Sequence, residues 1–210
     1  MVMNKRQFLF GGLATFLVLA EIAAAHARER FPISQKDVRR VPRRFRRQMV
    51  SYDGPEQQGT IIVDTAKRYL YLIEPDQKAT RYGIGVGRQG FSWSGRATVH
   101  RKVAWPRWVP PKDMVARDRF ARKWAHGMPG GPKNPLGARA LYLFQGEVDT
   151  LYRIHGTPEP RSIGRAVSSG CIRLLNVDIV DLYKRVPIGT PVVVLQTGLP
   201  PSPKTSDRRG

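Results

Sequence analysis

The residues of this sequence best suited to nucleophilic chemistry are Cys171 and His155. Cys171 is the only cysteine among 210 residues, and it follows His155 by sixteen positions. A thiol with an ordinary pKa of about 8.5 is mostly protonated at neutral pH, so a cysteine nucleophile needs a base beside it. An imidazole accepts that proton and holds the resulting charge as an ion pair. These residue types predict a cysteine nucleophile, with a buried small residue and a structural histidine as the alternatives.

The local sequence indicates how the two side chains would be positioned. His155 ends an apolar, strand-like run at residues 150–155, where side-chain direction is rigidly set. Gly170 allows an unusual backbone angle immediately before Cys171. That angle would turn the N–H groups of Gly170 and Cys171 towards a developing oxyanion. Asn176 is expected to cap a helix reaching residue 186, whose N-terminal dipole would slightly favour a thiolate.

The elements that must position this pair are mostly strands. β-Branched and aromatic runs at residues 60–64 and 69–73, separated by a short polar turn, predict a hairpin. A short helix is expected at residues 112–124, and four glycines and three prolines make residues 127–137 a loop. Further strands are expected at residues 80–86, 96–105, 138–144 and 190–196. The sequence therefore predicts one mainly β domain at residues 59–196, large enough to bury a core.

The first 27 residues have the pattern of a secretory signal peptide. Lys5 and Arg6 precede an apolar stretch at residues 8–20, and the small-x-small sequence AHA follows at residues 25–27. The apolar stretch is shorter than the roughly 20 residues that span a bilayer, although an uncleaved membrane anchor is the alternative. The sequence thus predicts an exported protein of the periplasm or cell envelope. It would meet the membrane only through residues 1–27, before cleavage.

The segments flanking the domain are basic or polar. Residues 28–58 contain three Arg-Arg pairs and sparse apolar residues, so we expect a basic flexible linker there and a disordered tail at residues 197–210. The formal net charge of the chain is +20. An exported protein with this positive charge would meet anionic envelope polymers. No nucleic-acid-binding motif is recognisable, so no nucleic-acid partner is expected. The linker is either a solvated stalk or an electrostatic attachment segment, and its removal is expected to leave the chemistry intact.

Other catalytic chemistries lack their sequence patterns. No His, Cys or acidic residues have metal-ligand spacing, so we expect no metal and no cofactor. No Ser-x-x-Lys occurs, which removes the serine-type mechanism of penicillin-binding proteins.

Several blocks in order resemble the L,D-transpeptidases of the YkuD type. His155-Gly156 is separated from Cys171 by fourteen residues, and the cysteine stands in the motif SSGCIRL. The blocks GTIIVD, YGIGVGRQGFSWSG, WPRWVPP and GGPKNPLGARALYL extend the resemblance over residues 59–196. The family pattern has a second histidine at the position of Ser169. This departure bears on any role of that second histidine but leaves the nucleophile and its base in place. The resemblance implies a β-sandwich with a few short helices, here preceded by a signal peptide and a basic linker.

The resemblance also implies roles for individual residues. Cys171 would attack the tetrapeptide stem of peptidoglycan, His155 would activate it, and the Gly156 carbonyl would steady the second ring nitrogen. Gly170 would contribute to the oxyanion site. The cleft would be lined near the substrate by Ser168, Ser169 and Arg173. The fork of Arg173 suits a carboxylate, with support of the loop through backbone carbonyls as the alternative.

The implied reaction is transfer of an acyl group through a Cys171 thioester to the side-chain amine of a neighbouring stem, leaving a 3→3 crosslink. Two alternatives remain open. Water or a free amino acid would resolve the same thioester in a carboxypeptidase, an exchange enzyme or a hydrolase. A non-catalytic wall-binding module would need no thiol.

Overall fold

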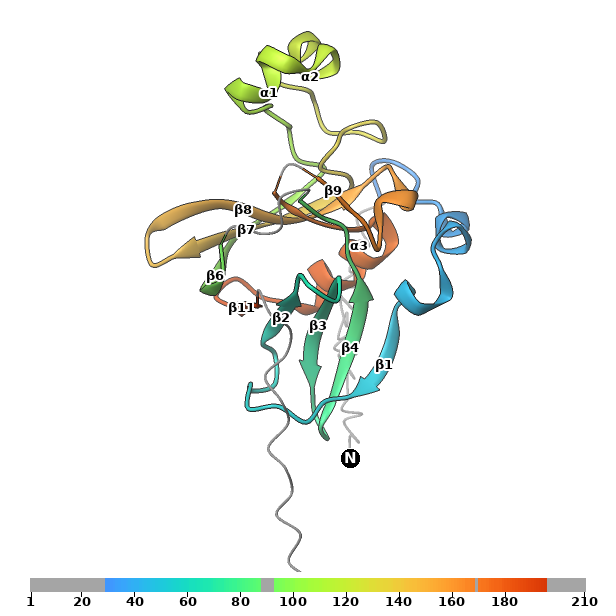
Figure 1. Cartoon of the computed structure of the whole chain (residues 1–210), viewed down its shortest axis with the longest axis vertical. Helices are drawn as coiled ribbons and strands as arrows, with labels where there is room; N and C mark the ends of the chain where they lie inside the picture. The colour runs from blue at the N-terminus through green and yellow to red at the C-terminus, as the bar shows by residue number, and fades with distance from the viewer. Residues whose placement is uncertain (1–28, 88–92, 169, 196–210) are drawn as a thin grey trace, which may run out of the picture. The chain divides into compact units, whose positions relative to one another are not determined.

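Strands dominate the computed structural model, which describes residues 29–87, 93–168 and 170–195. Within these ranges, nine strands form one sheet in the order β1-β4-β3-β2-β11-β6-β7-β8-β10, and β5 pairs separately with β9 (Figure 1). The strands are β1 (Gln48–Ser51), β2 (Ile61–Asp64), β3 (Tyr69–Glu74), β4 (Lys78–Gly83), β5 (Val86–Gly87), β6 (Gly95–Ala104), β7 (Arg139–Gln145), β8 (Val148–Thr157), β9 (Ala166–Ser168), β10 (Ile172–Leu175) and β11 (Pro191–Leu195). The mainly β fold predicted from the sequence is confirmed.

The two halves of the large sheet share one core. Leu70 of β3 and Leu141 of β7 lie far apart in the strand order, yet both are fully buried in the same hydrophobic cluster. Figure 1 shows the reason, because β7 and β8 run crosswise above β3 and β4. Helix α3 (Asn176–Arg185) adds the buried side chains of Ile179 and Leu182 to this cluster. The arrangement is the predicted β-sandwich with a few short helices.

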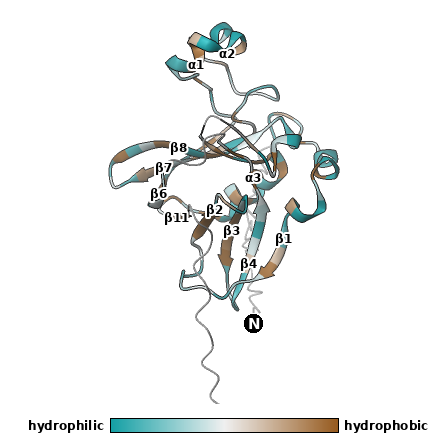
Figure 2. Cartoon of the chain, viewed as in Figure 1, coloured by the Kyte–Doolittle hydropathy of each residue, from teal (hydrophilic) through white to brown (hydrophobic). Residues whose placement is uncertain are grey.

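The predicted hairpin is the antiparallel pair of β2 and β3, in which Ile61 lies opposite Leu72. Both residues point into the main core. Because side chains alternate along a strand, Ile62 and Tyr71 point to the other face of the sheet. That face is also buried, in a second cluster that includes Tyr52. The hydrophobic colouring of β3 in Figure 2 reflects this burial on both sides.

The segment expected to be a flexible basic linker, residues 28–58, is folded over much of its length. It contains the 3-10 helices η1 (Gln35–Arg40) and η2 (Arg43–Phe45), and β1 pairs antiparallel with β4. Its few large apolar side chains are the reason, since Val41, Phe45 and Tyr52 are each less than 10% exposed. Val41 and Phe45 have helical spacing, but too few apolar residues accompany them in this basic stretch for the sequence pattern to reveal the packing. The prediction of a flexible linker is therefore wrong for residues 35–52.

An ionic contact also ties this segment to α3. Arg47 Nη1 lies 2.7 Å from Asp181 Oδ1, and Arg47 Nε lies 3.7 Å from Asp178 Oδ1. Asp178 is only 3% exposed, and its burial raises the pKa of its carboxyl to about 6 even though Arg47 opposes the shift. Part of the positive charge of residues 28–58 is therefore paired with carboxylates of α3.

The single helix expected at residues 112–124 is two short helices, α1 (Lys112–Arg117) and α2 (Arg119–Lys123). Asp118 separates them and caps the second, because its carboxylate accepts a hydrogen bond of 2.8 Å from the N–H of Ala121. The remaining 3-10 helix is η3 (Pro160–Ser162).

Helices in the described ranges are too short and too polar to cross a bilayer. The predicted signal peptide at residues 1–27 and the predicted tail at residues 197–210 lie outside the described residues.

We predict that Arg47→Met lowers the free energy of unfolding by about 1 kcal/mol near pH 8 and by less near pH 5. Above the pKa of Asp178, about 6, its buried carboxylate is charged and needs Arg47, whereas below it the carboxyl is mostly neutral. Urea unfolding at both pH values measures the difference. Arg43→Met, at an exposed position of the same segment, is the control. An equal loss at both pH values would contradict the pairing.

Candidate active site

The parallel pairing of β8 with β10 sets the side on which the predicted site residues lie. Ile172 of β10 pairs with Ile154 of β8, and Arg173 pairs with His155. Successive residues of a strand point to opposite faces, and paired residues of neighbouring strands share a face. Ile154 and Ile172 point into the main core. His155 and Arg173 therefore point to the opposite face.

Cys171 lies in the turn between β9 and β10, directly before the first residue of β10. A hydrogen bond with the backbone of Arg153 ties its thiol to β8, two residues from His155. Gly170 precedes it with φ of +129°, a backbone conformation that side chains with a Cβ rarely adopt. The unusual backbone angle expected at Gly170 is thus present. The predicted nucleophile, Cys171, therefore lies beside the part of β8 that carries its predicted base, His155.

His155 is anchored by the backbone next to it. Its Nδ1 lies 2.6 Å from the carbonyl oxygen of Gly156, as the family resemblance implied. A carbonyl only accepts, so Nδ1 carries the proton, and Nε2 of the neutral ring is the basic nitrogen. The side chain is 4% exposed. Burial lowers the pKa of His155 to about 4, although hydrogen bonds to the backbone of Gly156 and Leu136 favour the protonated ring.

The thiol is also held in its neutral form. Cys171 is partly buried as a residue, but protein atoms crowd its sulfur, and this burial raises the pKa of the thiol. The backbone hydrogen bond from Arg153 and the charges of Arg153 and Arg173 act in the opposite direction. At neutral pH the resting pair is therefore a thiol and a neutral imidazole. The ion pair expected from the residue types would form only when the proton moves during reaction.

Arg153 is a residue of this site that the sequence analysis missed. Its guanidinium forms a two-fold ion pair with Asp149, with N–O distances of 2.7 and 2.8 Å, and stacks on Tyr142 at 4.3 Å. The alternation of Arg153, Ile154 and His155 along one strand was the available signal, because it places the arginine and the histidine on one face. The pairing fixes a positive charge near the thiol.

Arg173 is largely buried, with 17% of its side chain exposed. Its Nη1 lies 3.0 Å from Oε2 of the exposed Glu159, while its buried Nε has no hydrogen-bond partner among the described residues. The backbone of Arg173 exchanges two hydrogen bonds of 2.9 Å with Gly85. The loop is therefore held here by the Arg173 backbone, and the guanidinium faces a carboxylate rather than carbonyl groups.

The two predicted substrate-binding serines differ in what the structure describes. Ser168 is the last residue of β9, and its backbone pairs with Gly87 of β5. Ser169 lies outside the described residues.

Asn176 connects the surroundings of His155 with α3. It is the first residue of that helix and not the N-cap that the sequence predicts. The N-cap is Leu175, whose side chain makes no capping hydrogen bond. The Oδ1 of Asn176 instead accepts a hydrogen bond of 2.9 Å from the N–H of Ala138. A Cβ at Gly137 or Gly156 would overlap this oxygen. The two glycines thus allow Asn176 to hold the end of the 127–137 loop against β8.

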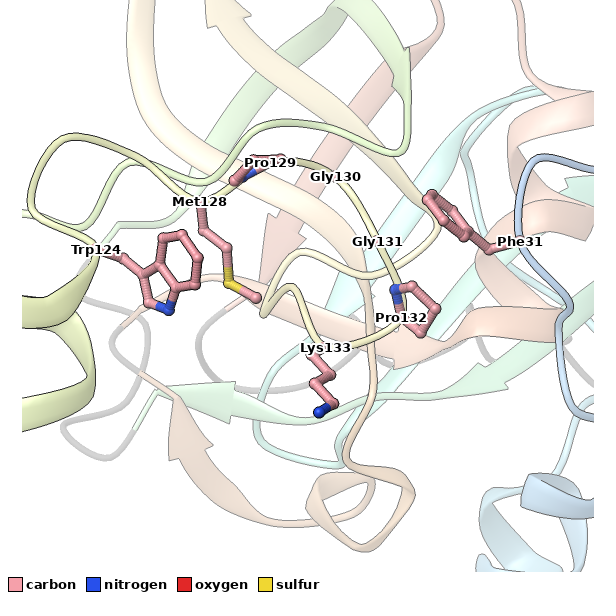
Figure 3. Close-up of a pocket in the computed structure, with 8 residues that line it drawn as sticks. All are labelled: Phe31, Trp124, Met128, Pro129, Gly130, Gly131, Pro132 and Lys133. Carbon is pink, nitrogen blue, oxygen red and sulfur yellow. The ribbon is translucent and has the colours of Figure 1, made fainter.

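The loop at residues 127–137 forms much of an apolar cavity of about 410 Å³, shown in Figure 3. Its lining residues are Phe31, Trp124, Met128, Pro129, Gly130, Gly131, Pro132 and Lys133. Neither Cys171 nor His155 lines it, so the cavity is not the candidate active site.

Within the described ranges, no three His, Cys, Asp or Glu side chains lie close enough together to hold a metal ion.

A model of the L,D-transpeptidase catalytic domain, YkuD, matches residues 58–194. The matched part contains both strands of the candidate site and the whole sheet except β1. The fold and the matched sequence together identify the catalytic domain of an acyl-transferring enzyme. The chain belongs to the family of L,D-transpeptidase catalytic domains.

Individual relatives agree with this assignment. The probable L,D-transpeptidase ErfK/SrfK of Escherichia coli K12 is 37% identical over 143 residues, which cover 64% of this chain and 43% of that protein. The probable L,D-transpeptidase YbiS of the same strain is 37% identical over 140 residues, covering 64% and 44%. The chain thus matches less than half the length of these curated relatives.

A solved structure is similar to this chain over more of its length. It is described as a probable carnitine operon oxidoreductase from Brucella melitensis, and it covers 76% of this chain and 98% of its own. The sequences are 50% identical, and the TM-score is 0.51. The likeness supports the fold.

We predict that alkylation of Cys171 by iodoacetamide accelerates continuously from about pH 6 to about pH 9, because burial raises the pKa of the thiol and the imidazole is neutral. A reactive thiolate held by an imidazolium would instead give a plateau below about pH 7, and that plateau would contradict the neutral resting pair.

We further predict that Arg153→Met slows this alkylation about threefold or more at pH 8, because a positive charge that favours the thiolate is lost. Arg101→Met is the matched control, since Arg101 stacks on the same Tyr142 ring at 3.9 Å without acting on the thiol. Equal rates for the two variants would show that Arg153 has no electrostatic effect on Cys171.

Proposed function

We propose that this chain transfers acyl groups of peptidoglycan stem peptides through a thioester on Cys171, forming 3→3 crosslinks in the cell envelope. The observation that carries the proposal is the thiol of Cys171 tied to β8 beside a histidine whose Nδ1 is anchored on the Gly156 carbonyl. This arrangement lies within the matched family domain. The family resemblance supplies the substrate class.

Acylation begins when the thiol of Cys171 attacks the carbonyl of the L-centre of diaminopimelate. As the sulfur–carbon bond forms, the thiol proton moves to Nε2 of His155. The backbone N–H groups of Gly170 and Cys171 stabilise the oxyanion. The carbon–nitrogen bond to the terminal D-alanine then breaks, and His155 returns the proton to the leaving amine.

Transfer repeats these steps with a new amine. The side-chain amine of a second stem attacks the thioester carbonyl, and His155 accepts a proton from it. The sulfur–carbon bond breaks, the sulfur leaves with negative charge, and the proton on His155 restores the thiol. His155 thus acts as base and then as acid in each half of the reaction.

The surrounding charges suit this sequence of steps. A neutral imidazole with a pKa of about 4 is free to accept a proton at neutral pH. The negative charge on the sulfur or the oxyanion is transient, and Arg153 and Arg173 stabilise it without keeping the thiol ionised at rest.

Arg173 is the group we propose for recognition of a substrate carboxylate. Its guanidinium already pairs with the exposed carboxylate of Glu159, and its buried Nε has an unused donor. A stem carboxylate would displace Glu159 and gain a bidentate contact. We also propose, from the family resemblance, that the hydroxyl groups of Ser168 and Ser169 contribute to substrate binding.

Location and envelope attachment complete the proposal. Residues 1–27 would direct export as a signal peptide. The exposed arginines of η1 and η2, among them Arg39, Arg43 and Arg44, would attract anionic envelope polymers. The attraction would come from a folded surface rather than from a flexible stalk.

We predict that Arg43→Glu combined with Arg44→Glu weakens binding to purified sacculi at low salt and has little effect above about 0.5 M salt, where charges are screened. Arg119→Glu with Arg122→Glu reverses the same number of charges on α2 and serves as the control. Sedimentation with sacculi measures both. Binding that is insensitive to the first pair would remove this surface from the proposal.

The central test is turnover of a disaccharide-tetrapeptide with a second stem as acceptor. Cys171→Ala should abolish D-alanine release, and His155→Gln should lower it about a thousandfold, because the nucleophile or its base is lost. Chromatography of the products distinguishes crosslinked dimers from tripeptide, which would indicate transfer to water. Full turnover in Cys171→Ala would overturn the mechanism.

A further inference from the structure

The segment before the matched family domain packs against residues on both sides of the turn that carries Cys171. The family match begins at residue 58, whereas η1 and η2 lie at residues 35–45. Helix η1 contacts η3, which opens the loop that leads into β9. Figure 1 shows this neighbourhood, with the segment in blue beside the orange loop.

Phe45 is the central side chain of that contact. It ends η2, is 7% exposed, and shares a buried cluster with Val41, Ile163 and Leu175. Its ring lies 5.3 Å from the ring of Tyr69. Ile163 precedes Cys171 in the chain and Leu175 follows it. The buried cluster that contains Phe45 therefore includes residues on both sides of the nucleophile.

Two glycines show how closely Phe45 approaches. A Cβ at Gly164 would overlap the Phe45 ring, and a Cβ at Gly83 would overlap the Phe45 carbonyl. Gly164 also has φ of +83°, so the backbone bends where the ring covers it. Its N–H donates a hydrogen bond of 2.9 Å to the Ile84 carbonyl. The loop is thus confined between Phe45 on one side and the end of β4 on the other.

The confined loop leads directly to the nucleophile. Ala166 pairs with Val86, Ser168 pairs with Gly87, and the turn at Gly170 and Cys171 follows. Displacement of the loop at Gly164 would therefore move β9 and change the position of the thiol relative to His155.

We propose that Phe45 is a positioning residue for Cys171, and that residues 35–45, which form η1 and η2, belong to the catalytic unit. The inference rests on the proposed function for its effect on turnover, but not for its effect on the thiol. It also reverses the expectation that residues 28–58 can be removed without affecting the chemistry.

The test compares Phe45→Ala and Phe45→Leu with Tyr52→Leu in the full chain. Tyr52 is a buried aromatic residue of the same segment, 8% exposed, but it packs in the cluster on the far face of β2 and β3. It controls for lost stability. Melting temperatures first establish a temperature at which all variants are folded, and Phe45→Leu keeps an apolar side chain in case Phe45→Ala does not fold.

Two rates are then measured for each variant. In the Phe45 variants we expect acyl transfer to fall about ten- to a hundredfold, because misplacement of a reacting group by about 1 Å has effects of this size. We expect alkylation of Cys171 by iodoacetamide to rise, because a released turn exposes the thiol to water. Tyr52→Leu should change both rates less than about twofold.

Equal effects of the Phe45 and Tyr52 variants on both rates would overturn the proposal, as would Phe45 variants that behave like the parent chain. If the parent chain transfers no acyl group, the proposed function fails by itself. The alkylation rates still decide whether Phe45 positions the thiol.

Discussion

The parallel register of β8 and β10 is the constraint on which the rest of this structure depends. It pairs Ile154 with Ile172 on the core face and His155 with Arg173 on the other. A shift of the pairing by one residue would exchange these faces. Burial of the two isoleucines therefore keeps His155 and Arg173 on the face of the candidate site. Asn176 secures the same region from α3, through its hydrogen bond to Ala138. The hydrophobic core and the candidate active site are therefore two faces of one pair of strands.

Burial of this site has a chemical consequence. It lowers the pKa of His155 and raises the pKa of Cys171, so neither side chain is charged at neutral pH. Such a pair costs less to bury than a thiolate and an imidazolium. The charge then has to appear during the reaction, where Arg153 and Arg173 lie close enough to stabilise it. Family membership agrees with this chemistry.

Much of the fold could be predicted from local sequence patterns, and the errors share one physical origin. The β2–β3 hairpin was predictable because strongly β-forming runs flank a short turn, and the contact of His155 with Gly156 followed from the family motif. Folding of residues 35–52 was missed because apolar residues are few in this basic stretch, and Val41 and Phe45 are buried partly by Ile163 and Leu175, more than 100 positions away. The effect of Arg153 on the thiol was missed because, although the alternation along β8 places Arg153 beside His155, only the pairing of β8 with β10 brings Cys171 to it. Local patterns identify strands, but long-range register decides which residues meet.

The most direct test of the central claim is intact-mass spectrometry of the protein after incubation with a disaccharide-tetrapeptide, without and with a second stem as acceptor. The account predicts a mass increase from an acyl thioester on Cys171, formed with loss of D-alanine and cleared into a crosslinked product when the acceptor is added. An unmodified mass in a folded protein with a reduced thiol would contradict it and would favour a non-catalytic wall-binding module.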